Sequence, residues 1–251
     1  MTQNFQEILL DLDGDTARIT LNRPSALNAI TPLMLTELEA ALSEVSKQDA
    51  IRFVVLTGEG RAFSAGVDLK ALGERELVNG KVGDFIDIPA RKVIESIEKL
   101  PQPVIARVNG FCFTGALEIV LACDLVVVSE KARLGDTHAK WGLRPTWGMS
   151  QRLVRRVGVA KARELSLTAR TLTGQDAVDL GIANQVASAD DLDTTIEKLI
   201  DEMRPNSSEA FIAYKDLYRA ADNLGLHDGL NYEAETDYEF TDSHERLAEF
   251  R

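Results

Sequence analysis

Residues 103–124 read PVIARVNGFCFTGALEIVLACD, and more of the predicted fold rests on them than on any other segment. A short apolar strand (104–108) ends at a turn, and an apolar helix follows from Gly115. The main-chain N–H of Gly115 is therefore one of the donors that a helix N-terminus leaves unpaired, and the helix dipole adds partial positive charge there. Glu118 lies three residues later on the same face of the first turn.

A donor that can hold an oxyanion, placed beside a carboxylate, is the combination that proton transfer next to a carbonyl needs. The alternative is that Glu118 is a buried acid whose oxygens accept hydrogen bonds from backbone amides. This segment alone does not decide between the two interpretations.

The segments before this stretch predict strands and one helix. Residues 6–12 and 15–21 alternate between apolar and polar around Asp13-Gly14, which predicts a hairpin. Thr31-Pro32 is typical of a helix start, and an apolar helical face follows it. Residues 52–57 predict a buried strand.

The segments on either side of residues 103–124 complete the pattern. Residues 71–88 are polar and without a period, so we expect a mobile loop, followed by a helix over about 90–100. Strands are expected at 124–128 and near 132–134, and mostly helix from Gly148 onward. Since the order strand, strand, helix recurs, the fold class is α/β with a helical C-terminal third.

Composition limits the possible partners. The chain has 251 residues and a formal net charge of -12, which argues against nucleic acid or an anionic membrane as the main partner. A small anionic ligand is compatible, because helix N-termini and local basic groups can hold its phosphates.

The cysteines and the apolar segments indicate a compartment. Cys112 and Cys123 lie in apolar surroundings without metal-ligand spacing, as in a reduced cytosolic protein. The N-terminus carries acidic residues where a signal peptide is basic, and Glu118 and Asp124 interrupt the most apolar run. We therefore expect a cytoplasmic protein.

A second segment, residues 61–70 with the sequence RAFSAGVDLK, identifies a family together with 103–124. Both resemble the signature stretches of the crotonase superfamily, which includes enoyl-CoA hydratases and isomerases. The resemblance extends over nearly the whole chain and includes RPSALNA (23–29), GLRPTWG (142–148) and LTGQDAVDLGI (172–182). It is a strong signal for the family and a weak one for the reaction.

The resemblance implies a specific architecture. It predicts a crotonase-type spiral of repeated strand–strand–helix turns as the core domain, over residues 1–195. Residues 196–251 are expected to form a C-terminal helical region that mediates trimerisation, often with two trimers stacked.

The resemblance also implies an oxyanion hole and a coenzyme A site. The motif positions give the main-chain N–H groups of Val67 and Gly115 as the two donors. The candidates for coenzyme A binding are Ala26, Ala65, Gly66, Asp68 and Lys70. For Asp68, capping of the following helix is an alternative, and Lys70 has the alternative of a solvated surface lysine.

His138 is the most informative departure from the family pattern. Glu118 occupies the position of one catalytic glutamate of the hydratases, but the second is replaced by His138. A histidine can still donate or accept a proton near neutral pH, so hydration with Glu118 as base and His138 as partner is allowed. The alternative is that His138 only hydrogen-bonds Glu118 or Asp136 and lines the pocket. Asp136 is a candidate for orienting the imidazole, although strand-like alternation would place the two side chains on opposite faces.

Three functions follow from the resemblance. The first is an acyl-CoA-processing lyase of the enoyl-CoA hydratase type, which adds water to a 2-enoyl-CoA through a thioester enolate. The second is a double-bond isomerase that uses Glu118 alone. The third is a non-catalytic acyl-CoA binding protein, against which the retention of Glu118 speaks. No metal or redox cofactor is implied, since coenzyme A is part of the substrate.

Overall fold

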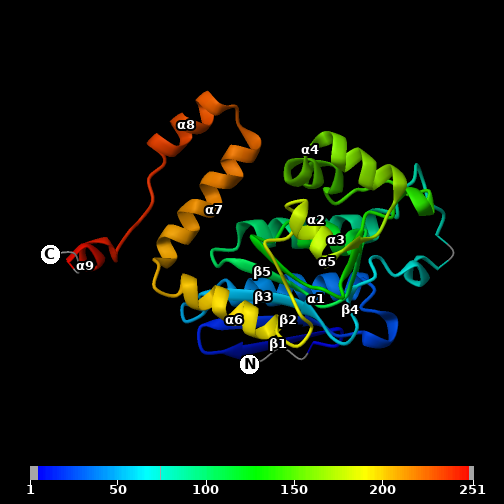
Figure 1. The fold of residues 1–251 in the computed structure, drawn as a ribbon, viewed down its shortest axis with the longest axis horizontal. Coiled ribbons are helices and arrows are strands. Elements are labelled where there is room, and N and C mark those ends of the chain that lie inside the picture. The colour runs from blue at the N-terminus through cyan, green and yellow to red at the C-terminus, as the bar shows by residue number, and fades with distance from the viewer. Residues whose placement is uncertain (1–4, 74, 249–251) are drawn as a thin grey trace.

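The computed structural model describes residues 5–73 and 75–248 and arranges them as two sheets surrounded by helices (Figure 1). The strands are β1 (Ile8–Asp13), β2 (Thr16–Leu21), β3 (Phe53–Gly58), β4 (Ala62–Ser64), β5 (Val104–Val108), β6 (Phe111–Phe113), β7 (Leu125–Ser129), β8 (Arg133–Gly135), β9 (Leu172–Thr173) and β10 (Gln185–Ala187). The α-helices are α1 (Pro32–Val45), α2 (Asp84–Lys99), α3 (Gly115–Val120), α4 (Met149–Thr168), α5 (Gly174–Asp179), α6 (Leu192–Met203), α7 (Ser208–Asn223), α8 (Leu226–Glu235) and α9 (Ser243–Ala248). Short 3-10 helices are η1 (Pro24–Ala26), η2 (Leu69–Leu72) and η3 (Ala139–Trp141).

The predicted recurrence of the order strand, strand, helix is confirmed, and the structure shows three such repeats, of which the sequence predicts the first strands but not β4 or β6. In each repeat the first strand (β3, β5, β7) joins one sheet, of order β1-β2-β3-β5-β7-β10. The second strand (β4, β6, β8) joins the other sheet, of order β4-β6-β8-β9. Successive repeats pair in parallel in both sheets, so each repeat advances the chain by one strand and the chain forms a spiral.

The N-terminal predictions are confirmed. β1 and β2 form an antiparallel hairpin whose last pair is Asp13 with Thr16. The side chain of Thr31 accepts a hydrogen bond from the N–H of Met34, which caps α1 ahead of Pro32 at its first position. The apolar face of α1 is buried.

The parallel strands β3, β5 and β7 of the larger sheet are buried on both faces, whereas the antiparallel edge strand β1 is largely exposed. One face packs into the main core with α1, α2 and α3. On the other face, α6 covers a smaller apolar cluster, made by Phe53, Val55, Ile105, Val127, Leu192, Ile196 and Ile200. α6 spans the predicted domain boundary between residues 195 and 196.

The start of α2 is a correction. The sequence predicts a loop over residues 71–88 and a helix from about residue 90, whereas α2 begins at Asp84 and contains Pro89. The reason is that the helix face is set by packing: Ile86, Asp87 and Ala90 are all buried against the core, and this outweighs the backbone hydrogen bond that Pro89 cannot make. β4, β6, β9 and β10 are also missing from the prediction, because strands of two or three residues show no clear period.

The C-terminal helices lie apart from the sheets. In Figure 1, α7 runs beside the body, α8 lies at its far end and α9 projects away from the core. α8 and α9 have no buried residue among those described, and several of their apolar side chains are exposed, including Leu226 and Leu230. Among the described helices, none has the length and apolar character that crossing a bilayer requires.

Candidate active site

Two backbone segments meet at the ends of β4 and β6. These strands pair in parallel, with Ala62 beside Phe111 and Ser64 beside Cys112, so the chain leaves both strands in the same direction. Gly66 then lies directly against Thr114: a Cβ on Gly66 would overlap Thr114 Oγ1 and lie 2.8 Å from the carbonyl oxygen of Phe113. Only glycine fits this close approach at a φ of +92°.

The next residue of each segment presents a main-chain donor. Gly66 N donates to Ser64 Oγ, Asp68 N to Ile30 O and Thr114 N to Gly135 O. Within the described residues, by contrast, the N–H groups of Val67 and Gly115 donate to no protein oxygen. Both residues line the same cavity. The cavity therefore has two main-chain donors available for one acceptor.

Thr114 has a strained backbone. Its φ of 47° and ψ of -115° lie in a region that L-residues other than glycine rarely occupy, at a cost of about 1–3 kcal/mol. This conformation turns the chain sharply into α3, so that Gly115 is the first residue of the helix. The strained conformation of Thr114 therefore directs the N–H of Gly115 toward the cavity.

Glu118 is a buried carboxylate held by backbone donors. It is 1% exposed, and its Oε1 accepts hydrogen bonds from Trp147 N at 3.0 Å and Met149 N at 2.8 Å. Burial raises the pKa of Glu118 above its usual range, although nearby His138 and the two amides favour the ionised form. Oε2 is left to face His138.

His138 lies between two carboxylates. Its Nδ1 is 2.7 Å from Asp136 Oδ1, and its Nε2 is 3.7 Å from Glu118 Oε2. The second distance is too long for a direct hydrogen bond and short enough for a water or a reacting group to contact both. Burial alone would raise the pKa of Asp136, but hydrogen bonds from His138 and Ser166 hold it below its usual value.

The alternation argument against the Asp136–His138 contact is wrong. β8 ends at Gly135, and Asp136 is followed by a turn in which the N–H of His138 donates to Asp136 Oδ1 at 3.2 Å. Such a turn, in which an aspartate binds the backbone two residues on, brings the two side chains to the same side. The alternation rule applies only within a strand.

The cavity that contains these groups has a volume of about 100 Å³. Its lining combines Val67, Gly115, Glu118 and His138 with apolar and polar side chains from neighbouring segments, which include Leu69, Val82, Asp87, Leu143, Thr146 and Trp147. The described residues therefore bring all four predicted catalytic positions together around one space.

Trp147 forms one wall of this cavity. Its ring is packed so closely on Gly115 that a Cβ there would overlap Cζ3 and lie 2.9 Å from Cη2. Its indole N–H donates to Asp87 Oδ1 at 2.8 Å, and Thr146 Oγ1 donates to the same oxygen at 2.9 Å. Asp87 is 2% exposed and lies in the first turn of α2, where the helix dipole favours a negative charge. It fixes the indole against Gly115.

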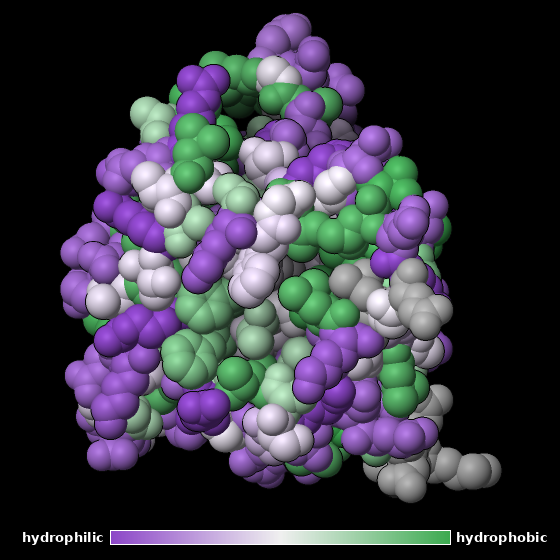
Figure 2. All heavy atoms as spheres, turned by 90° about the vertical axis from the view of Figure 1, so that its right-hand side faces the viewer, coloured by the Kyte–Doolittle hydropathy of each residue, from purple (hydrophilic) through white to green (hydrophobic). Residues whose placement is uncertain are grey.

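The segments that line the cavity also carry exposed apolar side chains. Figure 2 views the molecule from the right-hand side of Figure 1 and shows apolar side chains gathered near the middle of that face. The exposed apolar residues of the adjoining segments are Leu69, Leu77, Val78 and Ile88.

The predicted coenzyme A positions are only partly gathered at the cavity. Ala65 lines it, and Gly66 makes the close approach to Thr114. Asp68 caps η2 by accepting from Lys70 N at 3.0 Å and pairs with Arg23, while the Lys70 side chain is exposed. Ala26 ends η1 and does not line the cavity, but the next residue, Leu27, accepts a hydrogen bond from Ala65 N at 2.9 Å.

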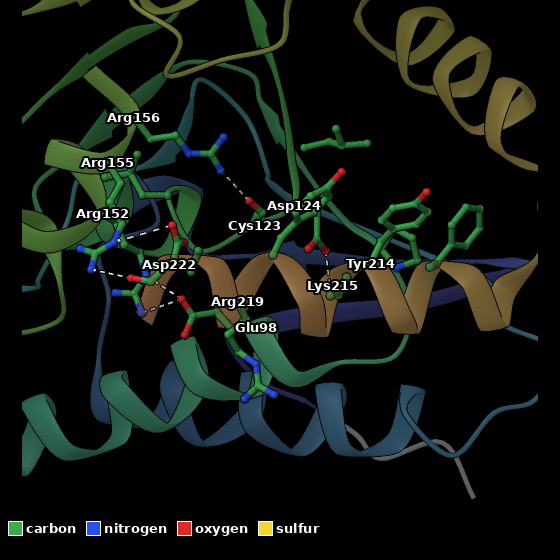
Figure 3. A pocket seen from close by; sticks show the side chains of 16 residues that line it. Glu98, Cys123, Asp124, Arg152, Arg155, Arg156, Tyr214, Lys215, Arg219 and Asp222 are labelled. Carbon is green, nitrogen blue, oxygen red and sulfur yellow. Dashed lines mark hydrogen bonds and ion pairs between the residues drawn. The ribbon is translucent and has the colours of Figure 1, made fainter. Parts of the chain in front are cut away.

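A larger cavity, of about 530 Å³, lies between α4 and α7 (Figure 3). Its charged side chains pair with one another, as the dashed lines in Figure 3 show for Lys215 with Asp124 at 2.7 Å. Arg152 pairs with Glu98, also at 2.7 Å. Asp124 also accepts from Val104 N at 2.7 Å, so it joins the residue before β7 to the start of β5. Most of these charges are paired within the protein, whereas Arg156 donates to the carbonyl oxygen of Cys123 at 3.2 Å.

Sequence reasoning missed two residues of the candidate site, Asp87 and Ser166, and one contact, that of Trp147 with Gly115. Asp87 was placed in the polar segment 71–88, and only its position on a helix would have marked it as buried. A tryptophan in the segment 142–148 is compatible with a core or pocket-wall position, but its contact with Gly115 has no signal in the sequence. Ser166 donates to Asp136 Oδ2 from 30 residues away, and no local signal links the two.

Known proteins show the same sequence pattern and fold. The family model for enoyl-CoA hydratase/isomerase matches residues 13–249. An Arabidopsis thaliana protein named probable enoyl-CoA hydratase 1, peroxisomal, is 34% identical over 238 residues, which is 94% of this chain and 88% of that protein.

Solved structures of other proteins have the same fold as this chain. The crystal structure of an enoyl-CoA hydratase from Bacillus anthracis superposes with a TM-score of 0.89 at 31% identity, over 98% of this chain and 96% of that one. A Thermobifida fusca relative, solved in complex with CoA, has a TM-score of 0.81 at 32% identity, over 97% of this chain and 94% of that one.

Proposed function

The chain belongs to the enoyl-CoA hydratase/isomerase family, and on that premise we propose that it adds water to a 2-enoyl-CoA through a thioester enolate. The observation that supports this most directly is the cavity into which Val67, Gly115, Glu118 and His138 all project. The Thermobifida fusca relative with bound CoA supports an acyl-CoA as the ligand.

In the proposed reaction the thioester oxygen accepts hydrogen bonds from Val67 N and Gly115 N. These donors stabilise the negative charge that develops on that oxygen when the enolate forms. The two amides are fixed before substrate arrives, because β4, β6 and the strained Thr114 set their directions. No metal is required for this stabilisation, and we propose that dialysis against a chelator leaves the activity unchanged.

Proton transfer is assigned to Glu118 and His138. A water held between Glu118 Oε2 and His138 Nε2 loses a proton to Glu118 while its oxygen forms the bond to the β-carbon. The electron pair of the double bond moves toward the thioester, and the α-carbon receives a proton from Nε2 of the protonated ring of His138. This leaves the neutral ring with its proton on Nδ1, and the proton on Glu118 then passes to Nε2, which restores both groups. Burial suits Glu118 to this role, because a raised pKa makes the carboxylate a stronger base near neutral pH.

The test is turnover of crotonyl-CoA by the purified protein, followed as loss of the conjugated thioester absorbance. Glu118→Gln should lower kcat by about 10²–10⁴-fold. The matched control is Glu37→Gln, since Glu37 is also buried and accepts two backbone hydrogen bonds away from the cavity. No turnover with several acyl lengths, or a Glu118→Gln variant as active as the parent, would reject the proposal.

Isomerisation of the double bond is the second candidate. The observation that favours it is the single glutamate: His138 occupies the position of the hydratases' second one, and a double-bond shift needs one base and no bound water. Incorporation of solvent deuterium without a 3-hydroxyacyl product would establish the isomerase. Tight binding of acyl-CoA with no product at all would instead indicate a non-catalytic binding protein.

We also propose that residues 196–251 mediate assembly into a homotrimer or a dimer of trimers. The exposed apolar side chains of α7 and α8, such as Ile212, Leu226 and Leu230, support this. Light scattering measures the assembly directly, and a monomer at micromolar concentration would contradict it. The two free, buried cysteines support a cytoplasmic location.

A further inference from the structure

Three side chains form a hydrogen-bonded series that ends at the cavity. Ser166, in the last turn of α4, donates to Asp136 Oδ2 at 2.6 Å. Asp136 Oδ1 lies 2.7 Å from Nδ1 of His138, and His138 Nε2 lies 3.7 Å from Glu118 Oε2. The series therefore connects α4 to the cavity through the segment that follows β8.

Asp136 restrains the imidazole at two points. The same oxygen, Oδ1, accepts both the backbone N–H of His138 at 3.2 Å and the ring Nδ1 at 2.7 Å. Rotation of the ring would break the shorter bond. Ser166 in turn occupies the second oxygen of Asp136, so the carboxylate cannot rotate without losing that bond.

The ion pairs of Asp136 are also informative. Asp136 is 4% exposed, and within the described residues its ion pair is with His138 and not with a lysine or arginine. A buried carboxylate is costly unless it is paired and hydrogen-bonded. A partner that can carry charge is therefore placed on the side of Asp136 that faces the cavity.

The contact determines which ring nitrogen carries the proton. An ionised carboxylate only accepts hydrogen bonds, so the nitrogen 2.7 Å from it must be an N–H. In the neutral ring this leaves Nε2 with the free lone pair, and Nε2 is the nitrogen that faces Glu118. We propose that Asp136, held by Ser166, is a positioning residue that keeps neutral His138 in the Nδ1–H tautomer. As a result, Nε2 is the ring nitrogen that gains and loses a proton at the cavity.

The exchange itself rests on the proposed function, whereas the tautomer does not. The competing explanation is that Asp136 merely braces the segment after β8 against α4. Bracing would affect the stability of the protein but would leave the tautomer of His138 indifferent to the charge on residue 136.

Nitrogen-15 NMR of the histidine rings separates the two explanations. The chain has 3 histidines, and the other two, His227 and His244, are exposed and serve as internal references. The variant His138→Gln identifies the signals of His138. At a pH where the rings are neutral, the parent protein should show His138 predominantly as the Nδ1–H tautomer.

Two variants then test the series. Asp136→Asn keeps the shape but removes the charge, and it should abolish the tautomer preference. Ser166→Ala should weaken that preference, whereas Thr168→Ala should not, since Thr168 is on the same helix but bonds only the carbonyl of Glu164. An Nε2–H tautomer in the parent, or an unchanged Nδ1–H tautomer in Asp136→Asn, would overturn the proposal.

Kinetics gives the second readout. If the hydratase reaction is established, Asp136→Asn should lower kcat by about 10²-fold or more while KM changes little, because the residue acts through His138 and not on the bound acyl group. An unchanged kcat in a variant that has lost the tautomer preference would overturn the catalytic part of the proposal. The NMR result needs no turnover, so failure of the proposed function leaves the tautomer assignment testable.

Discussion

Substitution of Gly115 by alanine tests the contact on which the site geometry depends most. Gly115 has an ordinary helical backbone, so alanine is not excluded by conformation. The obstacle is Trp147, whose ring lies where the new methyl group would be placed. Trp147 cannot simply move away, because Asp87 holds its indole N–H and Glu118 holds its backbone N–H.

The expected magnitude follows from opposing effects. Carbon atoms pack at about 3.5–4.0 Å, so the ring must move by about 1 Å from its present contact. Overpacking of this kind costs about 1–3 kcal/mol. Replacing glycine by alanine in a helix returns about 0.5–1 kcal/mol. We therefore expect Gly115→Ala to lower the free energy of unfolding by about 1–2 kcal/mol.

The effect on turnover should be larger than the effect on stability. A displacement of about 1 Å at Trp147 also moves the amide that holds Glu118, and such a misplacement can reduce the rate by about 10²-fold. Urea denaturation gives the stability, and crotonyl-CoA hydration gives kcat. Gly229→Ala is the matched control, because no atom lies near its added methyl group and the substitution should stabilise α8.

A double-mutant cycle identifies the cause. Trp147→Leu removes the obstructing ring, so Gly115→Ala should cost little stability in that background, with a coupling of about 1–2 kcal/mol. If Gly115→Ala alone keeps full stability and full turnover, or if its cost is the same with and without the tryptophan ring, the proposed contact does not constrain the site.

Three further predictions concern other parts of the molecule. Glu118→Gln should be more stable than the parent at neutral pH, because burial raises the pKa of Glu118 and its ionisation then opposes folding. The difference in the free energy of unfolding should grow as pH rises above about 4.3, the usual pKa of a glutamate. Urea denaturation over a pH series measures this difference, and a difference that does not change with pH would contradict the prediction. Thr114→Gly should raise the free energy of unfolding by about 1 kcal/mol by relieving the strained backbone, and a loss of stability in the same assay would contradict the strain. Lys215→Met should lower the free energy of unfolding by about 2 kcal/mol, because Lys215 joins α7 to Asp124 and to two backbone carbonyls. The control is Lys99→Met on the surface of α2, which should change the free energy of unfolding by less than about 0.5 kcal/mol.

The sequence predicts the first strand of each repeat well, because there each local signal agrees with the packing, whereas the three-residue strands β4 and β6 carry too short a pattern to be recognised. The hairpin at Asp13-Gly14, the cap at Thr31 and the strands at 104–108 and 124–128 all combine a turn or cap residue with an apolar period. The start of α2 was missed because Pro89 resembles a helix boundary, while burial of Ile86 and Asp87 extends the helix in front of it.

The sequence predicted those parts of the site in which a motif reflects the backbone conformation. Val67 and Gly115 follow from glycine-containing motifs, whose close approach the structure shows at Gly66 and Thr114. The hydrogen bonds between side chains at the site were not predictable from the sequence, because Ser166 and Asp87 belong to helices that are distant in the chain. A contact between residues 30 or 60 positions apart, such as Ser166 with Asp136, leaves no local trace in one sequence.

The most direct measurement of the central claim is a crystal structure of the protein with acetoacetyl-CoA, a thioester whose enolate is readily formed. The account predicts the thioester oxygen about 2.7–3.1 Å from both Val67 N and Gly115 N, with the carboxylate of Glu118 beside the carbons of the acyl group. A thioester oxygen that meets only one of these amides, or an acyl group bound outside this cavity, would contradict it.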